Sequence, residues 1–411
     1  MESECRWGSA VWSLNADRAV LVLNSGSSSL KFGLFDVVEG RTLVAVRGEV
    51  ENVGREGGRF WVHFSDGRPV DREIDTADHR EALRLVRSAI EPPDVAAPRV
   101  VVHRIVHGGA DHRTPEVIGE GILTDLDRLV PAAPLHLIPA LELVRAARGA
   151  FPEALAVACY DTGFHATMPE AAQRYPLPAS LWDEGVRRLG FHGLACEDVV
   201  GQVPDGGRMI IAHLGSGASV TAVDGGRGRD TTMAFTPTGG VVMGTRPGDL
   251  DPGLITYLVG AVGMKPEAID EMLNHRSGLL GISGVTSDLK VLLESRAVDD
   301  RAELAVRMFV VSVAKQIAAM MSVLGGCDTL VFSGGIGERS PQVRAAIIER
   351  LAFAGLELDP GANSAGTATI STVGSTATVR VVEVDEERVM ARHGLEVWQA
   401  SEGMARNEPN R

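Results

Sequence analysis

The chain has 411 residues, of which 45% are hydrophobic, 23% charged and 5% aromatic, and its formal net charge is −14. This composition indicates a soluble globular protein with enough apolar residues for two domains. The sequence contains no run of Lys and Arg. We therefore expect neither nucleic acid nor an anionic membrane as a partner, and any anionic ligand must be held by local groups.

The cysteines and the first residues bear on the cellular compartment. Cys5, Cys159, Cys196 and Cys327 are far apart and form no CxxC pair, which argues against a disulfide framework or a zinc site. The start, "MESECRWGSA", is acidic and lacks the apolar core of a secretory signal. A cytoplasmic protein is expected.

Segments rich in Val and Ile alternate with helical segments along the chain. Strands are predicted at "AVLVLN" (19–24), "RVVVHRIV" (99–106), "ALAVACYD" (154–161), "RMIIAHL" (208–214), "TLVFSGG" (329–335) and "TVRVVEV" (378–384). Apolar residues three and four apart predict helices at 79–91, 139–151 and 301–324, the last unusually apolar and central. The alternation predicts an α/β fold.

Three other segments are interpreted from composition. The near-apolar run "GLITYLVGAVGM" (253–264) is too short to span a bilayer and is expected to be a buried helix. Residues 1–17 and 400–411 show no periodicity, so irregular tails are expected there. Residues 361–379 support no assignment, either as a loop or as an edge strand.

Two Gly-Ser turns follow predicted strands in a similar way. In "VLNSGSSS" (22–29) and "IAHLGSGA" (211–218), a polar residue and then Gly-Ser follow an apolar run, and a second β-like run comes next. Each segment predicts a β-hairpin. Glycine lets the backbone approach an anion and serine supplies donors, so the turns are either ordinary hairpin turns or equivalent phosphate-binding turns of two related domains. Lys31, just beyond the first turn, favours the second interpretation.

A third glycine-rich turn, "LVFSGGIGERSPQVRAAI", leads from a predicted strand into a predicted helix. It matches neither the Rossmann GxGxxG nor the Walker GxxxxGK[ST] pattern, so those two folds are not supported. A helix N-terminus behind a glycine turn nevertheless suits a nucleotide phosphate.

From about residue 19 to 396 the chain resembles the acetate kinase family, of the acetate and sugar kinase, Hsp70 and actin superfamily. The motifs occur in family order: "VLNSGSSSLKF", "HRIVHGG", "APLH", "YDTGFHATMP", "GFHG", "AHLGSGAS", "DTTMAFTP", "MGTRPGDLDPG" and "SGGIGERS". The resemblance implies two domains of duplicated actin-like, ribonuclease H-like topology around a nucleotide cleft. The expected ranges are a tail at 1–18, an acyl-side domain at 19–165 plus 386–399, a nucleotide-binding domain at 166–385 and a tail at 400–411.

The implied reaction is reversible transfer of the γ-phosphoryl of ATP to acetate. An acceptor carboxylate is already ionised at neutral pH, so it needs no general base. It needs a planar donor that holds two oxygens near an anionic phosphate, which Arg provides better than Lys. Arg104 and Arg246 match the two family arginines, and His192 matches the histidine that stabilises the transferring phosphoryl. Asp161 matches a family acid/base, although orientation of Arg or of metal-bound water is physically more plausible.

The resemblance also implies the ligand-binding residues. Asn24 and Glu386 match the magnesium positions, with Mn²⁺ as an alternative metal, although Asp385 and Glu387 adjoin Glu386. The acyl methyl group is expected at Val106, Leu135, Phe191 and Pro237, four residues that periodicity alone would place in the core. ATP is expected at the first-domain phosphate loop and at three second-domain segments: Ser27, Ser29 and Lys31; His213, Leu214, Gly215, Ser216 and Gly217; Asp288, Leu289 and Lys290; Gly334, Gly335, Ile336, Gly337 and Glu338.

The chain departs from the family pattern at several positions. Ser216 stands where Asn is usual and Lys290 where Arg is usual, which affects nucleotide affinity or base preference. Apolar or small residues replace polar ones beside the acyl positions: Leu194, Ala195 and Cys196 replace Thr-Ser-His, Leu137 and Ile138 replace Asn-Pro, and Gly239 replaces Glu. Either a longer acyl chain is used, or the surroundings of the pocket are rebuilt for acetate.

Other functions are weighed against acetate kinase. A propionate or other short-chain acyl kinase is the nearest alternative. A nucleotide-binding regulator or chaperone-like ATPase lacks support, because 411 residues occupied by cleft motifs leave no room for a client domain. A sugar kinase is disfavoured, since no clear base for a neutral hydroxyl is present apart from Asp161. The resemblance also implies a homodimer and a role in acetyl-CoA biosynthesis.

Overall fold

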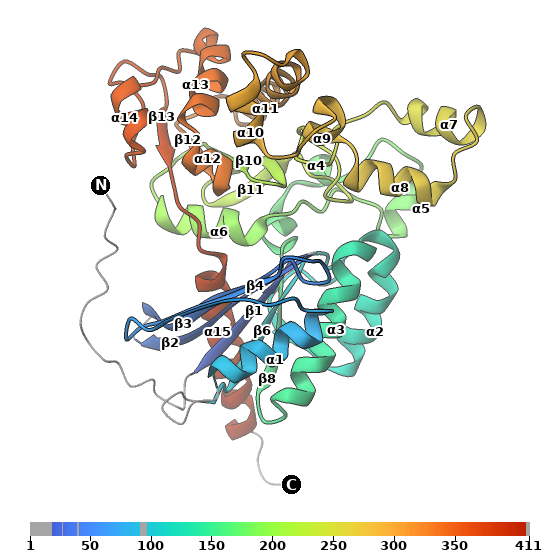
Figure 1. Cartoon of the computed structure of the whole chain (residues 1–411), viewed down its shortest axis with the longest axis vertical. Coiled ribbons are helices and arrows are strands. Elements are labelled where there is room, and N and C mark those ends of the chain that lie inside the picture. Colours follow the sequence, from blue (N-terminus) through green and yellow to red (C-terminus); the bar gives the residue numbers. More distant parts are fainter. Residues whose placement is uncertain (1–18, 27, 39–40, 91–96, 408–411) are drawn as a thin grey trace. The chain divides into compact units, whose positions relative to one another are not determined.

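The computed structural model describes residues 19–26, 28–38, 41–90 and 97–407. It is a mixed α/β structure that divides into two compact units (Figure 1). Unit 1 comprises Met1–Gly163 and Asp385–Arg411, and unit 2 comprises Phe164–Val384.

Unit 1 is built on one eight-stranded sheet with a mixed strand arrangement. In spatial order its strands are β5 (Pro69–Glu73), β4 (Arg59–Phe64), β3 (Arg41–Glu51), β2 (Ser29–Val38), β1 (Val20–Ser25), β6 (Val100–Ile105), β8 (Leu155–Tyr160) and β7 (Glu116–Val117). Its helices are α1 (His79–Ile90), α2 (Glu120–Leu129), α3 (Pro134–Ala150) and α15 (Glu386–Asn407). A short 3₁₀ turn at Val130–Ala132 joins α2 to α3.

Helices cover both faces of the middle of this sheet (Figure 1). Leu21 and Leu23 of β1 face a core that includes residues of α1 and α3. Val20 faces the other side, where Gly394 of α15 comes close to it. All six residues of β1 are buried, which explains why this strand appears in the sequence as a continuous apolar run rather than an alternating one.

Unit 2 contains a five-stranded sheet and most of the helices. The strands, in spatial order, are β11 (Arg227–Thr231), β10 (Ala218–Asp224), β9 (Met209–Leu214), β12 (Thr329–Ser333) and β13 (Thr378–Val381). The helices are α4 (Glu170–Gln173), α5 (Ala179–Asp183), α6 (Gly193–Gln202), α7 (Pro252–Gly260), α8 (Pro266–His275), α9 (Gly278–Ser283), α10 (Leu289–Ser295), α11 (Asp300–Leu324), α12 (Gly334–Arg339), α13 (Pro341–Arg350) and α14 (Pro360–Ala365). Further 3₁₀ turns occur at Gly163–Thr167 and Ala352–Ala354.

The two sheets share one topology. In unit 1 the order β3-β2-β1-β6-β8 has three antiparallel strands followed by two strands parallel to β1. In unit 2 the order β11-β10-β9-β12-β13 has the same directions. The duplication that the two Gly-Ser turns suggested is therefore confirmed, with each turn joining the first two strands of its sheet.

Most predicted elements are confirmed. All six predicted strands form, as β1, β6, β8, β9, β12 and β13. The three predicted helices also form, although α3 begins five residues earlier than expected, at Pro134. Among the described residues, α11 is long and apolar enough to cross a membrane, but it packs on the unit 2 sheet with Phe309, Val313 and Ile317 buried and is therefore a core helix.

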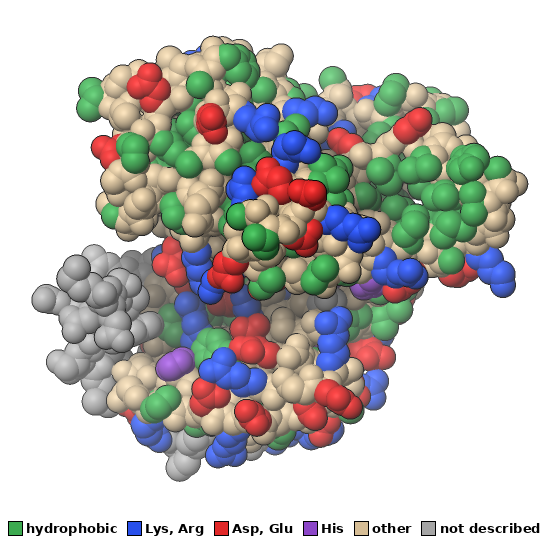
Figure 2. Space-filling model, turned by 45° about the horizontal axis from the view of Figure 1, so that its top comes forward, with side chains coloured by type: hydrophobic (Ala, Val, Ile, Leu, Met, Phe, Trp, Pro, Cys, Tyr) green, Lys and Arg blue, Asp and Glu red, His purple; other side chains and the backbone are tan. Residues whose placement is uncertain are grey.

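Two expectations are wrong. The run at 253–264 forms α7, but none of the residues of α7 is buried, and hydrophobic side chains gather over this helix at the right of Figure 2. Composition alone could not distinguish an apolar helix in the core from one on the surface. The irregular tail expected from residue 400 is helical as far as Asn407, because good helix formers continue α15 beyond Gly403.

Candidate active site

In unit 1, three of the expected site residues lie in one row across neighbouring strands. Asn24 of β1 pairs with Lys31 of β2. On its other side, the pairing of Leu23 with His103 brings Arg104 of β6 beside Asn24, and Arg104 Nη1 donates to Asn24 Oδ1 at 3.2 Å. Strand register therefore gathers residues that are up to 80 positions apart in the sequence.

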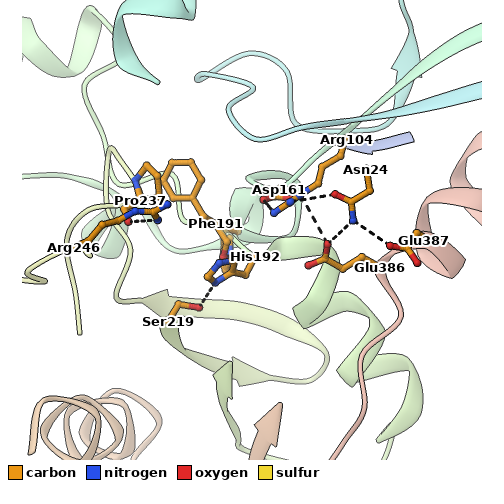
Figure 3. A network of polar contacts seen from close by, with 11 residues as sticks. Asn24, Arg104, Asp161, Phe191, His192, Ser219, Pro237, Arg246, Glu386 and Glu387 are labelled. Atoms are coloured by element: carbon orange, nitrogen blue, oxygen red, sulfur yellow. Dashed lines mark hydrogen bonds and ion pairs between the residues drawn. The ribbon is translucent and has the colours of Figure 1, made fainter. Parts of the chain in front are cut away.

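Arg104 is held in place by Asp161, which follows β8. Arg104 Nε donates to Asp161 Oδ1 at 2.9 Å and Nη2 donates to Oδ2 at 2.6 Å (Figure 3). The Asp161 side chain is only 1% exposed. A bidentate pair of this kind fixes the plane of the guanidinium. One edge of Arg104 is thus used by Asp161, while Nη1 lies at the opposite edge beside Asn24.

The acidic start of α15 completes this group in unit 1. Asn24 Nδ2 donates to Glu386 Oε2 at 3.1 Å and to Glu387 Oε1 at 3.4 Å (Figure 3). Glu386 Oε2 also lies 3.9 Å from Arg104 Nε. The sequence left open which of three neighbouring carboxylates belongs to the site, and Glu386 is the one close to both Asn24 and Arg104.

Burial and charge act together on these groups. Burial raises the pKa of Asp161, and the guanidinium of Arg104 opposes this shift. Burial would lower the pKa of Arg104, but Asp161 and Glu386 more than compensate, so its pKa is raised. Burial also raises the pKa of Glu387. The Arg104 guanidinium therefore stays protonated among these acidic residues.

In unit 2 the equivalent row carries histidine and serine. His213 is the fifth residue of β9, as Asn24 is the fifth residue of β1. It pairs with Ser219 of β10 and Ser333 of β12, and its Nδ1 lies 3.2 Å from Ser333 Oγ. His192 Nδ1 forms a hydrogen bond of 3.0 Å with Ser219 Oγ (Figure 3). The rings of His192 and His213 are 4.8 Å apart.

Two nitrogen-bearing side chains lie close to the backbone of Gly217. A Cβ built on Gly217 would be 3.3 Å from His192 Nε2 and 3.7 Å from Arg246 Nη1. Arg246 Nη1 donates to the Pro237 carbonyl at 3.1 Å. His192 has a left-handed backbone with φ 59° at the start of α6, which is uncommon for a residue other than glycine. The backbone is thus held in an unusual conformation at the point where the imidazole meets the glycine turn.

Close packing joins two of the three expected nucleotide segments in unit 2. Gly334 has φ +74°, and a Cβ there would come within 2.7 Å of the Leu214 carbonyl, so α12 begins directly against the end of β9. Gly334 N donates to Glu338 Oε1 at 2.9 Å. At α10, Asp288 Oδ1 accepts from Lys290 N at 2.8 Å and caps the helix. Lys290 is exposed.

The four expected acyl residues are divided between the units. Val106 in unit 1 is buried, whereas Leu135, at the start of α3, is 36% exposed and is not a core residue. Phe191 and Pro237 in unit 2 are buried. Ser27 of the expected phosphate loop lies outside the described residues.

The altered residues beside the acyl positions occupy different environments. Leu137 is fully buried in the core of unit 1 with Ile105 and Ala158, whereas Ile138 is 48% exposed. Leu194, Ala195 and Cys196 are buried in the first turns of α6.

The donor set in unit 1 fits a divalent metal held mainly by a nucleotide. Glu386 and Asn24 provide hard oxygen atoms, which Mg²⁺ prefers. Across the described chain, no group of three or more His, Cys, Asp and Glu residues could enclose a metal ion. The arrangement therefore suits a metal that keeps phosphate oxygens and water as most of its ligands.

Several residues that shape the site were missed by the sequence analysis. Ser219 and Ser333 are identified only by strand register. Arg344 is fully buried and donates to the carbonyls of Gly337 and Glu338 at 2.8 Å, so it fixes the backbone of α12. Arg47 reaches Asp385 from β3. Ser219, Ser333 and Arg344 lie within quoted glycine-rich segments and only Arg47 does not, but the contacts that all four make depend on strand register and tertiary packing, which no local pattern indicates.

The family model of the acetokinase family matches residues 19–392. The chain belongs to the acetokinase family. It is 40% identical over 388 residues to the acetate kinase of Nitrobacter hamburgensis, covering 92% of this chain and 95% of that protein. The resemblance inferred from the motifs is confirmed, and the protein is an enzyme of the acetate kinase type.

Two solved structures of acetokinase-type enzymes share the fold. Porphyromonas gingivalis acetate kinase is 34% identical, with a TM-score of 0.81, and the alignment covers 93% of this chain and all of that one. A propionate kinase from Francisella tularensis is 32% identical, with a TM-score of 0.86, and the alignment covers 92% of this chain and all of that one. Family membership implies ATP as a substrate and a divalent metal.

Proposed function

We propose that the protein transfers the γ-phosphoryl group of ATP reversibly to acetate, giving acetyl phosphate and ADP. The observation that carries this proposal is the close approach of His192 Nε2 and Arg246 Nη1 to the glycine turn at Gly217, within one unit. Phosphoryl transfer requires positioning and neutralisation of charge more than covalent participation. A glycine turn flanked by an imidazole and a guanidinium supplies both.

The residues of unit 2 are proposed to bind the nucleotide. His213 to Gly217, Asp288 to Lys290 and Gly334 to Glu338 belong to one unit, and Gly334 packs directly against Leu214. In this proposal Arg246 and His192 stabilise the charge that develops on the transferring phosphoryl. Lys290 carries one flexible ammonium group and cannot stack on a nucleotide base as arginine does. The base preference is therefore tested by comparing ATP with GTP.

The residues of unit 1 are proposed to hold the acceptor and part of the metal shell. Asp161 fixes Arg104 through Nε and Nη2, and Asn24 accepts one N–H of Nη1, so the second N–H of Nη1 is proposed to bind the acetate carboxylate. Asn24 and Glu386 are the proposed ligands of Mg²⁺, with Mn²⁺ as a substitute. When bound, the metal neutralises charge on the phosphates. Val106 and Leu135, with Phe191 and Pro237 of unit 2, are proposed to contact the acyl methyl group.

Asp161 is proposed to orient Arg104 rather than act as a general base. Both of its carboxylate oxygens accept from Arg104, at 2.9 and 2.6 Å. An ionised acetate needs no base, whereas the hydroxyl of a sugar does. This geometry favours a carboxylate acceptor over a sugar.

The decisive experiment measures acyl phosphate trapped as the hydroxamate. Acetate, propionate and butyrate are each tested with ATP and with GTP. We expect acetate with ATP to give the highest kcat/KM and propionate to react too, because a pocket distinguishes one methylene by only about 1–3 kcal/mol. A higher kcat/KM for propionate would establish the alternative function. No product with any acid would refute the proposal.

We also propose that the protein is cytoplasmic and forms a homodimer through α7. Leu254, Tyr257 and Val259 are 40%, 58% and 46% exposed on this helix (Figure 2). A contiguous apolar surface of this kind is typical of an interface. Light scattering should show a dimer that Tyr257→Arg shifts toward monomer, whereas Phe353→Arg, at an 80% exposed site elsewhere in unit 2, leaves the mass unchanged.

A further inference from the structure

Three consecutive acidic residues, Asp385, Glu386 and Glu387, lie where the chain returns from unit 2 to unit 1. Their partners differ. Asp385 Oδ2 lies 2.7 Å from Arg47 Nη2, and Glu387 Oε2 lies 3.7 Å from Arg47 Nε. Arg47 therefore bridges the first and third carboxylates, while the second, Glu386, lies beside Asn24 and Arg104.

The position of Arg47 on the sheet explains how it reaches α15. Arg47 of β3 pairs with Gly33 of β2. Because Gly33 has no side chain, the Arg47 side chain can pass over β2. The guanidinium lies over the Phe35 ring, 5.9 Å from its centroid. A Cβ at Gly33 would overlap that ring. The glycine and the aromatic ring thus provide a surface along which the arginine extends toward α15.

We propose that Arg47 is a positioning residue for Glu386, an inference that rests on the proposed role of Glu386 at the metal. Three adjacent carboxylates repel one another. Glu387 already accepts from Asn24 Nδ2 at 3.4 Å, so it competes with Glu386 for the same donor. Arg47 draws Asp385 and Glu387 to its own side and leaves Glu386 facing Asn24 and Arg104.

The test measures the dissociation constant of Mn²⁺ for the full-length protein in the presence of ADP. Electron paramagnetic resonance detects the free and bound Mn²⁺. Arg47→Met removes the bridge, and we expect Mn²⁺ to bind about five- to tenfold more weakly. The Mg²⁺ concentration for half-maximal activity should rise by a similar factor, while the KM for acetate changes less than twofold. A purely structural role would lower the melting temperature without this separation.

The sign of the change is informative. If Arg47 acted only as a nearby positive charge, its removal would tighten cation binding. Tighter or unchanged Mn²⁺ binding in Arg47→Met would therefore overturn the proposal. Asp385→Asn is a nearly isosteric second variant. If Arg47 acts through Asp385, the double variant should bind Mn²⁺ no more weakly than Arg47→Met alone, and additive losses would also contradict the proposal.

Arg59→Met is the matched control. Arg59 lies on the neighbouring strand β4 and forms an ion pair of 2.7 Å with Asp71, and its side chain is 47% exposed. We expect this variant to bind Mn²⁺ like the unaltered protein. Because Mn²⁺ binding is measured without turnover, a failure of the Arg47 proposal is distinguishable from absence of acetate kinase activity in the unaltered protein.

Discussion

At the residue scale, the lack of a side chain at Gly217 allows His192 and Arg246 to lie close to the glycine turn. Gly217→Ala would place a methyl group 3.3 Å from His192 Nε2 and 3.7 Å from Arg246 Nη1. The His192 imidazole must then move by a few tenths of an ångström, whereas Arg246 remains at ordinary contact distance. We expect kcat to fall about tenfold, equivalent to about 1.4 kcal/mol in the barrier, with the fold intact.

The control for this prediction is Gly201→Ala, since no atom lies within 4 Å of a Cβ at that position in α6. Steady-state kinetics with both substrates and a thermal melt of each variant make the comparison. An unchanged kcat in Gly217→Ala would show that phosphoryl transfer does not depend on the close approach of His192 to Gly217.

His103 links the stability of unit 1 to pH. Neither ring nitrogen has a hydrogen-bond partner among the described residues, and burial lowers the pKa of His103 to about 3. In the unfolded chain the pKa of histidine is about 6.5. Between these values the unfolded chain binds a proton that the folded chain does not, so stability is complete above pH 6.5 and falls toward pH 3 by about 1.4 kcal/mol per pH unit.

His103→Leu should remove this slope. We expect the free energy of unfolding at pH 7 to be equal or higher, because two unsatisfied nitrogens are replaced by apolar atoms, and to decline less steeply between pH 6.5 and 4.5. Urea titrations at several pH values measure the free energy of unfolding of both proteins. His63→Gln, at an exposed site on β4, is the control. A slope equal to that of the unaltered protein would mean that His103 gains a proton in the folded state.

At the scale of elements, helix α15 depends on one glycine. A Cβ at Gly394 would overlap Val102 Cγ2 and come within 3.4 Å of Val20 and Val100. These β-branched residues belong to two strands and have little freedom to move. Gly394→Ala should destabilise unit 1 by about 1–3 kcal/mol, despite the higher helix propensity of alanine.

Gly403→Ala is the control within the same helix. No atom lies within 4 Å of a Cβ at this position, so only helix propensity acts. We expect a stabilisation of about 0.5–1 kcal/mol. Chemical denaturation of the two variants gives opposite signs if α15 packs on the sheet through Gly394. Equal signs would be inconsistent with that packing.

The elements most accurately predicted from sequence are those whose burial matches their composition. β1 and β9 are buried on both faces and appear as continuous apolar runs. α7 was misplaced because an apolar helix on the surface has the composition of a core helix. In the site, motifs identified Arg104 and Asn24, but the partnership of Arg47 with Asp385 joins residues 338 positions apart. Such a contact depends on the register of three strands and the return of the chain, which no local pattern encodes.

At the scale of the whole molecule, the two units are completed differently along the chain. Unit 2 is one continuous segment, Phe164–Val384, whereas unit 1 needs both Met1–Gly163 and Asp385–Arg411. We predict that a fragment of residues 164–384 folds alone and unfolds in a cooperative transition. A fragment of residues 1–163 should do so only when residues 385–411 are added as a peptide.

Circular dichroism measures the secondary structure of each fragment, and urea titration shows whether it unfolds cooperatively. Cooperative unfolding of residues 1–163 without the peptide would show that α15 is dispensable for unit 1. A peptide carrying Gly394→Ala should rescue less well than the unaltered one.

The location of α15 also has a consequence for the order of events during synthesis. Val20 and Val100, which α15 covers, are made long before the helix itself emerges from the ribosome. At about 5–20 residues per second, unit 2 takes roughly 10–45 seconds to translate. During that interval residues 1–163 lack α15 and are expected to stay unfolded, so their apolar segments offer a binding surface to chaperones and to other nascent chains. Residues far from the chemistry, such as Gly394, can therefore limit how much active protein a cell accumulates.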